Sequence, residues 1–179
     1  MKNVNLDNVE IFADSTKLPA GGYVCGITSV EDITDKEYLK FEFDIAEGEF
    51  KNYYRTLNES KGFWGGSFIK SYKEKALPFF KKMIAAFENS NKGFKFDYDE
   101  KTLRRKYIGL VLGEEEYTKG NGDIGTRLYV SDWKSIDDIR KGNFTVPAKK
   151  TLGGDAPKPY VPKSSNSLDI IEDEELPWA

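Results

Sequence analysis

Residues 38–45 read Tyr-Leu-Lys-Phe-Glu-Phe-Asp-Ile, and this stretch decides the fold class. Apolar side chains recur at every second position, at Leu39, Phe41, Phe43 and Ile45. An alternation of this kind is typical of a β-strand with one buried face. We therefore expect one face of this strand to belong to the core and the other to meet solvent.

Four further segments have strand patterns, at residues 23–30, 50–57, 107–117 and 124–133. Residues 75–89 instead have apolar side chains at helical spacing, with Pro78 in the first turn. Residues 67–72 are either a short extended piece or the lead-in to that helix, and residues 120–123, Gly-Asn-Gly-Asp, are typical of a hairpin turn. The order predicts a mainly β (α+β) domain, an OB-fold-like five-stranded barrel with one helix between strands 3 and 4.

The composition changes beyond Pro147, where Lys, Gly, Pro and Ser replace the periodic apolar residues. We expect a domain over residues 1–147, a flexible linker over 148–168 and an acidic tip over 169–179. Residues 164–179 contain five acids and no base, whereas residues 1–163 contain 27 bases and 25 acids, a net charge of +2. A mildly basic body with a disordered acidic tail suggests two different partners.

The chemistry that the chain can perform is restricted by what it lacks. It has no histidine and a single cysteine, Cys25, which removes the commonest general base and the usual zinc ligands. The acid run at residues 114–116 lies in an expected strand, where consecutive side chains point to opposite faces and cannot converge on one ion. We therefore expect no metal, no cofactor and no enzymatic activity, with Cys25 as core filler.

The location of the protein is expected to be the cytoplasm. No apolar run approaches the roughly 18 residues that cross a bilayer. The first twelve residues are polar and contain no hydrophobic signal core. We accordingly expect no membrane association.

Basic and aromatic side chains alternate in several expected strands. Single-stranded nucleic acid offers unpaired bases that stack on aromatic rings and phosphates that need nearby cations. Tyrosine is also simply a good strand former, and Trp64 could equally fold onto the core, so a purely structural interpretation stays open. The candidate nucleic-acid-binding residues are Lys51, Tyr53, Arg55, Trp64, Lys70, Tyr72, Arg127 and Tyr129.

The acidic tip ends in an apolar group that a purely solubilising tail would not need. Negative charge steers a basic partner, and a rigid apolar end can fill one pocket. The candidate partner-binding residues are Asp173, Glu174, Glu175, Leu176, Pro177 and Trp178.

Three runs carry a resemblance to a known family: LPAGGYVCGITSVEDITDKEYLKFEFDIAEGEFKNYY, FWGGSFIKSYKEKALPFFKKMIAAFENSN and GLVLGEEEY. Over roughly residues 10–150 the chain resembles small phage and prophage proteins of Gram-positive bacteria that are described as single-stranded-DNA-binding proteins. The end EDEELPWA is similar to the C-terminal tip of bacterial single-stranded-DNA-binding proteins, which recruits other DNA-processing proteins. Trp178 takes the place of that family's terminal phenylalanine, and Ala179 is an addition.

The resemblance implies a protein that binds single-stranded DNA without strong sequence preference during phage or mobile-element replication or recombination. Its tip would then recruit replication or recombination proteins. The alternative is a protein–protein adaptor on a small β-barrel with no nucleic-acid binding, which the small net charge of the body keeps open. The sequence also leaves homo-oligomerisation open.

Overall fold

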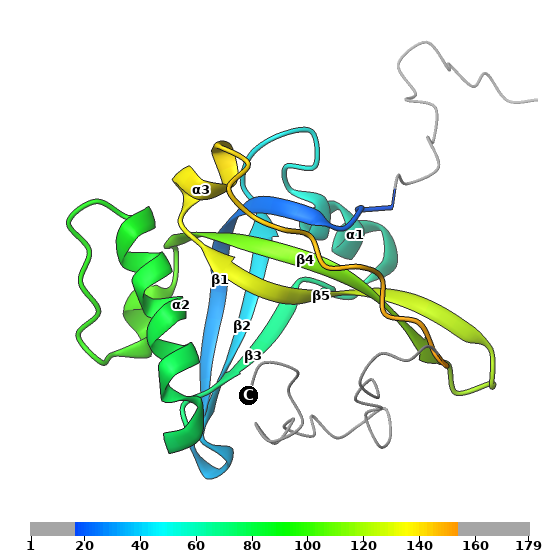
Figure 1. Cartoon of the computed structure of the whole chain (residues 1–179), viewed down its shortest axis with the longest axis horizontal. Coiled ribbons are helices and arrows are strands. Elements are labelled where there is room, and N and C mark those ends of the chain that lie inside the picture. The colour runs from blue at the N-terminus through cyan, green and yellow to red at the C-terminus, as the bar shows by residue number, and fades with distance from the viewer. Residues whose placement is uncertain (1–16, 154–179) are drawn as a thin grey trace, which may run out of the picture.

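A computed structural model describes residues 17–153 of the chain (Figure 1). Three short 3-10 turns, at Thr34–Lys36, Glu74–Ala76 and Glu100–Leu103, connect the main elements. The strands are β1 (Gly21–Ile33), β2 (Tyr38–Ile45), β3 (Ser67–Ser71), β4 (Tyr107–Thr118) and β5 (Ile124–Lys134). The helices are α1 (Tyr53–Lys61), α2 (Leu77–Ser90) and α3 (Ile136–Arg140). The expectation of a mainly β (α+β) fold with a helix between the third and fourth strands is confirmed.

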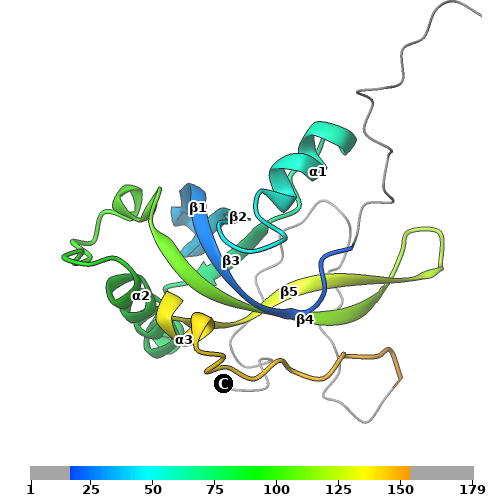
Figure 2. The same ribbon diagram turned by 90° about the horizontal axis from the view of Figure 1, so that it is seen from above.

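The five strands form one antiparallel sheet in the order β3-β2-β1-β4-β5. Its edge strands β3 and β5 approach each other through side chains, because the rings of Phe68 and Trp133 lie 6.2 Å apart. Pairing between β1 and β4 stops at Gly21 and Leu112, whereas pairing between β4 and β5 continues to Thr118 and Ile124. The β4–β5 hairpin therefore projects beyond the rest of the sheet, as both views show (Figures 1 and 2).

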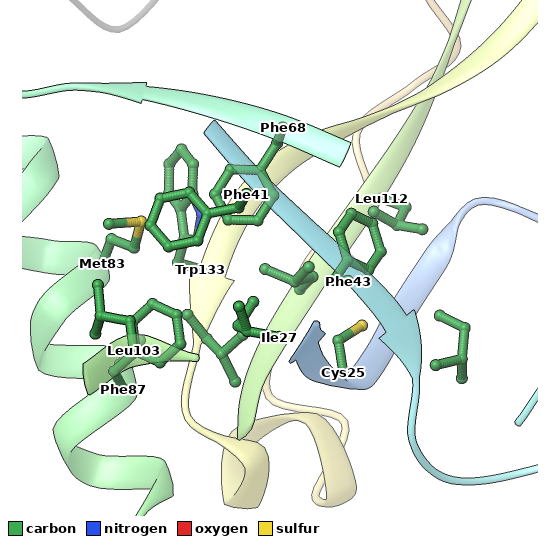
Figure 3. Packing of buried hydrophobic residues seen from close by; sticks show 14 of the residues in the cluster. Cys25, Ile27, Phe41, Phe43, Phe68, Met83, Phe87, Leu103, Leu112 and Trp133 are labelled. Carbon is green, nitrogen blue, oxygen red and sulfur yellow. The ribbon is translucent and has the colours of Figure 1, made fainter. Parts of the chain in front are cut away.

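The core lies between the inner face of the sheet and α2 (Figure 3). The predicted inward residues of β2 are all buried, and Phe41 stacks on Phe68 with ring centroids 4.7 Å apart. Met83 and Phe87 of α2 close the core from the other side. Cys25 is completely buried, and burial, followed by the nearby charge of Asp44, raises the pKa of its thiol well above the ordinary value. Its predicted role as core filler is confirmed.

The predicted strand over residues 50–57 is wrong, because this segment contains the start of α1. Asp44 on β2 is buried, and its carboxylate accepts hydrogen bonds from the backbone N–H groups of Ile45, Tyr54 and Arg55. It thus satisfies two of the unpaired N–H groups at the start of a helix, in place of a cap from the helix's own N-terminal residue. Residues 67–71 supply the third strand instead, so of the two readings of 67–72 the extended one is correct.

The solvent-facing side of β2 is also less exposed than the alternation predicts. Asp44 is buried because it caps α1, and Tyr38 is buried as well, whereas Lys40 and Glu42 are partly exposed. β1 continues to Ile33, three residues beyond the predicted strand at residues 23–30. No helix within residues 17–153 has the length and apolar character needed to cross a membrane.

The chain that follows α3 runs back along the outer face of β4 (Figure 2), and we call residues 143–152 the strap. A Cβ atom on Gly22 would lie 2.5 Å from the ring of Phe144, and one on Gly113 would lie 2.8 Å from Pro147. These glycines therefore allow the close approach of the strap. The backbone of Lys150 donates to the carbonyl of Glu114 and accepts from the N–H of Glu116. Ordered packing thus continues past the predicted domain boundary at residue 147.

Candidate nucleic-acid interface

The candidate residues at the start of α1 do not share a strand face. Lys51 and Arg55 are exposed. Tyr53 is half-buried, and its hydroxyl accepts a hydrogen bond of 3.2 Å from the backbone N–H of Leu18. The predicted alternation of these three residues on a strand is wrong, since they lie in a turn and a helix, where the spacing of a strand does not apply.

Lys70 does not present a cation to solvent. It points inward from β3, is 6% exposed, and places its Nζ atom 4.2 Å from the ring centroid of Trp133 and 5.3 Å from that of Phe79. The position is stabilised by cation–π attraction, which is strongest for tryptophan. As a candidate nucleic-acid-binding residue, Lys70 thus offers little of its side chain to a phosphate, because the strand alternation turns it into the core.

Tyr72 lies in acidic surroundings. Its hydroxyl donates a 2.8 Å hydrogen bond to Asp32. Burial and this hydrogen bond, together with the charges of Asp32, Glu37 and Glu100, raise the pKa of Tyr72 to about 12. A site with three nearby carboxylates is unfavourable for a phosphate chain.

Trp64 is partly buried against the core, and its Nε1 donates a 3.0 Å hydrogen bond to the carbonyl of Gly66. This is the core-packed arrangement that the sequence left open. The exposed aromatic of the same loop is Phe63, at 55% exposure.

Arg127 and Tyr129 lie on the outer face of the β4–β5 hairpin, where they belong to a larger arrangement. Three cross-strand pairs follow one another on this face, Gly113 with Tyr129, Glu115 with Arg127, and Gly125 with Tyr117. We call Tyr117, Glu115, Arg127 and Tyr129, together with Lys150 of the strap, the hairpin row.

Both tyrosine rings of the hairpin row lie across glycines of the opposite strand. A Cβ atom on Gly113 would be 2.7 Å from the ring of Tyr129, and one on Gly125 would be 3.0 Å from that of Tyr117. The lack of a side chain at each glycine leaves room for the ring of the opposite strand to lie close to the backbone. Both tyrosines are partly exposed, so part of each ring is accessible to solvent.

A cation lies over each of these rings. The guanidinium carbon of Arg127 is 5.2 Å from the ring centroid of Tyr117, and the Nζ atom of Lys150 is 4.1 Å from that of Tyr129. Between them, Arg127 Nε donates a 2.7 Å hydrogen bond to Glu115. Burial, followed by the charge of Glu115, raises the pKa of the Tyr129 hydroxyl. The hairpin row therefore combines aromatic faces with cations and has one carboxylate at its centre.

Sequence reasoning missed Tyr117 and Lys150. The glycines at 113 and 125 were the available signal, because a glycine in a strand often marks a close approach of another group. Their pairing with tyrosines depends on the register of the hairpin, which the alternation within a strand does not give. Lys150 was assigned to the linker.

The acid run divides between the two faces of the hairpin, as strand geometry predicts. Glu115 faces Arg127, whereas Glu116 and Glu114 lie on the other side within 4.0 Å of Lys149. Within residues 17–153, no group of three or more acidic or cysteine side chains is arranged to hold a metal ion.

The outer face of β2 and β3 differs from the hairpin row. Lys40 pairs with Ile69 across the strands, and Glu42 pairs with Ser67. These four positions contain one base, one acid and no aromatic ring. The hairpin row is therefore the better candidate for contact with bases.

The six candidate partner-binding residues of the tip, from Asp173 to Trp178, lie outside the described residues. A comparison of the sequence with models of protein families finds no match, and a comparison with curated proteins finds none either.

Proposed function

We propose that this protein binds single-stranded DNA without strong sequence preference, on an OB-type barrel, with the hairpin row as part of the interface. Support for the barrel comes from the strand order, in which β1 lies between β2 and β4. The position of α2 between β3 and β4 is that of the OB-fold helix. The approach of Phe68 to Trp133 brings the two sheet edges together.

The observation that carries the proposal is the pairing of each tyrosine ring with a cation. Tyr117 and Tyr129 lie on opposite sides of the Glu115–Arg127 pair, each two residues along the strands from it. The two tyrosines are therefore about 13 Å apart along the strand direction. Bases stack on such rings at a gain of roughly 1–3 kcal/mol each, whatever their identity. Arg127 and Lys150 supply positive charge next to these rings, and the phosphates of a bound strand need such charge.

The acidic tip gives the protein its second proposed task, which is recruitment of replication or recombination proteins. Residues 164–179 carry five acids and no base, and they end in Leu176, Pro177 and Trp178. A tip of this kind matches a small apolar pocket surrounded by Lys or Arg on a partner. Both tasks are those that the resemblance of the tip and of residues 10–150 to phage and bacterial single-stranded-DNA-binding proteins implies.

The test is a titration of fluorescent oligo-dT with the full chain at several salt concentrations. We expect binding at low salt that weakens as salt rises. The variant Y117L/Y129L keeps apolar bulk on both glycines and removes both aromatic faces. A loss of about 1 kcal/mol per ring predicts at least ~30-fold weaker binding.

The matched control is Phe63→Leu, which removes an exposed aromatic ring outside the hairpin row and should leave affinity unchanged. Absence of binding by the wild-type chain at low salt would contradict the proposed function and favour the protein–protein adaptor. Equal affinities of the wild type and Y117L/Y129L would remove the hairpin row from the interface.

A further inference from the structure

The connection between α2 and β4, residues 91–106, exposes one tyrosine almost completely, and we call this segment the α2–β4 loop. Tyr98 is 91% exposed. Its backbone has a φ of 67°, a left-handed conformation that is rare for a bulky side chain. Arg105 of the same loop has a φ of 65°. Such strain persists only where the surroundings hold it, and it is concentrated at functional sites.

The α2–β4 loop is fixed to the sheet by backbone hydrogen bonds. The N–H of Arg105 donates to the carbonyl of Ile27 at 2.9 Å, and the N–H of Ile27 donates to the carbonyl of Lys106 at 3.0 Å. The side chain of Asn91 also exchanges two hydrogen bonds with the backbone of Tyr107. These hydrogen bonds therefore fix both ends of the loop to β1 and β4.

The ring of Tyr98 extends a chain of aromatic contacts toward solvent. It lies 5.7 Å from the ring of Phe96, which lies 6.5 Å from the ring of Phe80 on α2. Phe96 and Phe80 are partly buried and anchor the chain to the fold. Tyr98 adds almost no burial of its own, so core packing does not explain a ring held in this position.

The α2–β4 loop also carries a concentration of positive charge. Residues 91–106 contain three acids and six bases, the latter being Lys92, Lys95, Lys101, Arg104, Arg105 and Lys106. Residues 17–153 as a whole contain 24 bases and 21 acids, a net charge of +3. The loop alone has three more bases than acids, so its net charge equals that of the whole described chain. The positive charge and the exposed ring thus occur in the same short segment.

Two of the three acids of the loop accept hydrogen bonds from the loop itself. Asp97 accepts hydrogen bonds from Asp99 N and Thr102 Oγ1, and Asp99 accepts one from Lys101 N, so both carboxylates stabilise the turn. Glu100 lies close enough to Tyr72 to contribute to its raised pKa.

The 3-10 turn at Glu100–Leu103 sets the direction of the nearest bases. Side chains three residues apart eclipse each other in this geometry, which places Arg104, just after the turn, on the side of Lys101. Leu103 is completely buried, so the opposite side of the turn faces the core. Within residues 17–153, neither Lys101, Arg104 nor Arg105 lies within ion-pair distance of a carboxylate.

We propose that the α2–β4 loop is a second contact for the same single-stranded DNA, an inference that depends on the proposed function. An exposed ring in the same loop as cations without ion pairs fits a polyanion with unstacked bases. In this site Tyr98 stacks on a base, and Lys101, Arg104 and Arg105 contact phosphates.

The two contacts lie at opposite ends of β4 (Figure 1), since the loop leads into Tyr107 and the hairpin turns after Thr118. The twelve residues of β4 span about 36 Å at ~3.3 Å per residue. At the B-form spacing of ~3.4 Å per nucleotide, a strand needs about eleven nucleotides to reach both contacts. An oligonucleotide of about six therefore occupies one contact, whereas one of about thirty can occupy both.

The test compares affinities of the full chain for oligo-dT of about six and about thirty nucleotides. The variant Tyr98→Asn removes the ring but tolerates the left-handed backbone, so the fold should persist. The measured quantity is the ratio of the affinity for the long oligonucleotide to that for the short one. We expect Tyr98→Asn to lower this ratio by at least ~5-fold, which is the effect of one lost stacking contact.

The double variant K101Q/R105Q tests the phosphate contacts. Loss of two contacts should lower the slope of log affinity against log salt by about 1.4 for the long oligonucleotide. The charge-matched control K61Q/K141Q changes two exposed lysines outside the loop and should keep the wild-type slope.

The second contact would be overturned if Tyr98→Asn kept the wild-type gain in affinity from the short to the long oligonucleotide and K101Q/R105Q kept the wild-type salt slope. The same result is expected if the loop binds a protein instead of DNA. Failure of the proposed function has a different signature, which is that the wild-type chain binds neither oligonucleotide.

Discussion

Glu115 provides a test in which the proposed function and a purely structural role of the hairpin row predict different results. Its carboxylate accepts the 2.7 Å hydrogen bond from Arg127 Nε, and its side chain is 13% exposed. If the row is only a structural feature, replacing Glu115 removes an ion pair and does not increase DNA affinity. If DNA binds there, the carboxylate repels each phosphate that Arg127 attracts.

The size of the effect follows from Coulomb's law. A carboxylate and a phosphate 4–6 Å apart in water repel each other by about 0.7–1 kcal/mol. The variant Glu115→Gln should therefore bind oligo-dT about 3–5-fold more tightly at low salt. The same change should lower the free energy of unfolding by no more than about 1 kcal/mol, the range of a partly exposed ion pair.

The assay is a fluorescence titration with oligo-dT, with urea unfolding as the measure of stability. The control is Glu59→Gln, which removes an exposed acid on α1 and should change neither quantity. A tyrosine pH titration supplies an independent readout, since removal of the Glu115 charge should lower the raised pKa of Tyr129. Unchanged or weaker DNA binding by Glu115→Gln would refute the electrostatic reasoning.

Two further predictions concern the fold that supports the site. Asp44→Ala leaves three backbone N–H groups without their acceptor and should lower the free energy of unfolding by about 3 kcal/mol in urea titrations, and a loss below about 1 kcal/mol would refute its capping role. Burial alone would raise the pKa of Asp132, but hydrogen bonds from Lys82 and from the Trp133 N–H lower it overall. Its contribution to stability is therefore present above the unfolded pKa of about 3.9 and is lost as pH falls through the lower folded pKa. Asp132→Asn should accordingly show a shallower loss of stability below about pH 4 than the wild type, and parallel curves would contradict this.

The parts of the fold that follow from local periodicity could be predicted from the sequence. The alternation around Phe41 and the helical spacing around Met83 each report which side chains are buried, and the structure confirms both. The segment after Asp44 could not be predicted in this way. Its apolar and aromatic residues fit a strand, but a carboxylate on a neighbouring strand determines that it begins a helix.

The candidate site was only partly predictable for a similar reason. Lys70 and Arg127 look alike in the sequence, since each is a base that alternates with an aromatic residue in a strand. In the structure, however, Lys70 faces the core, whereas Arg127 faces the outer side of the hairpin. The hairpin row depends on which residues face each other across β4 and β5. Lys150 joins it from more than twenty residues away, through the fold of the strap.

Photo-crosslinking tests most directly whether single-stranded DNA lies on the outer face of the β4–β5 hairpin, as we propose. Oligo-dT with a photoreactive base would be irradiated with the full chain, and the crosslinked peptides would be identified by mass spectrometry. We expect crosslinks at Tyr117 and Tyr129. Crosslinks confined to the outer face of β2 and β3, around Lys40 and Ile69, would contradict the claim.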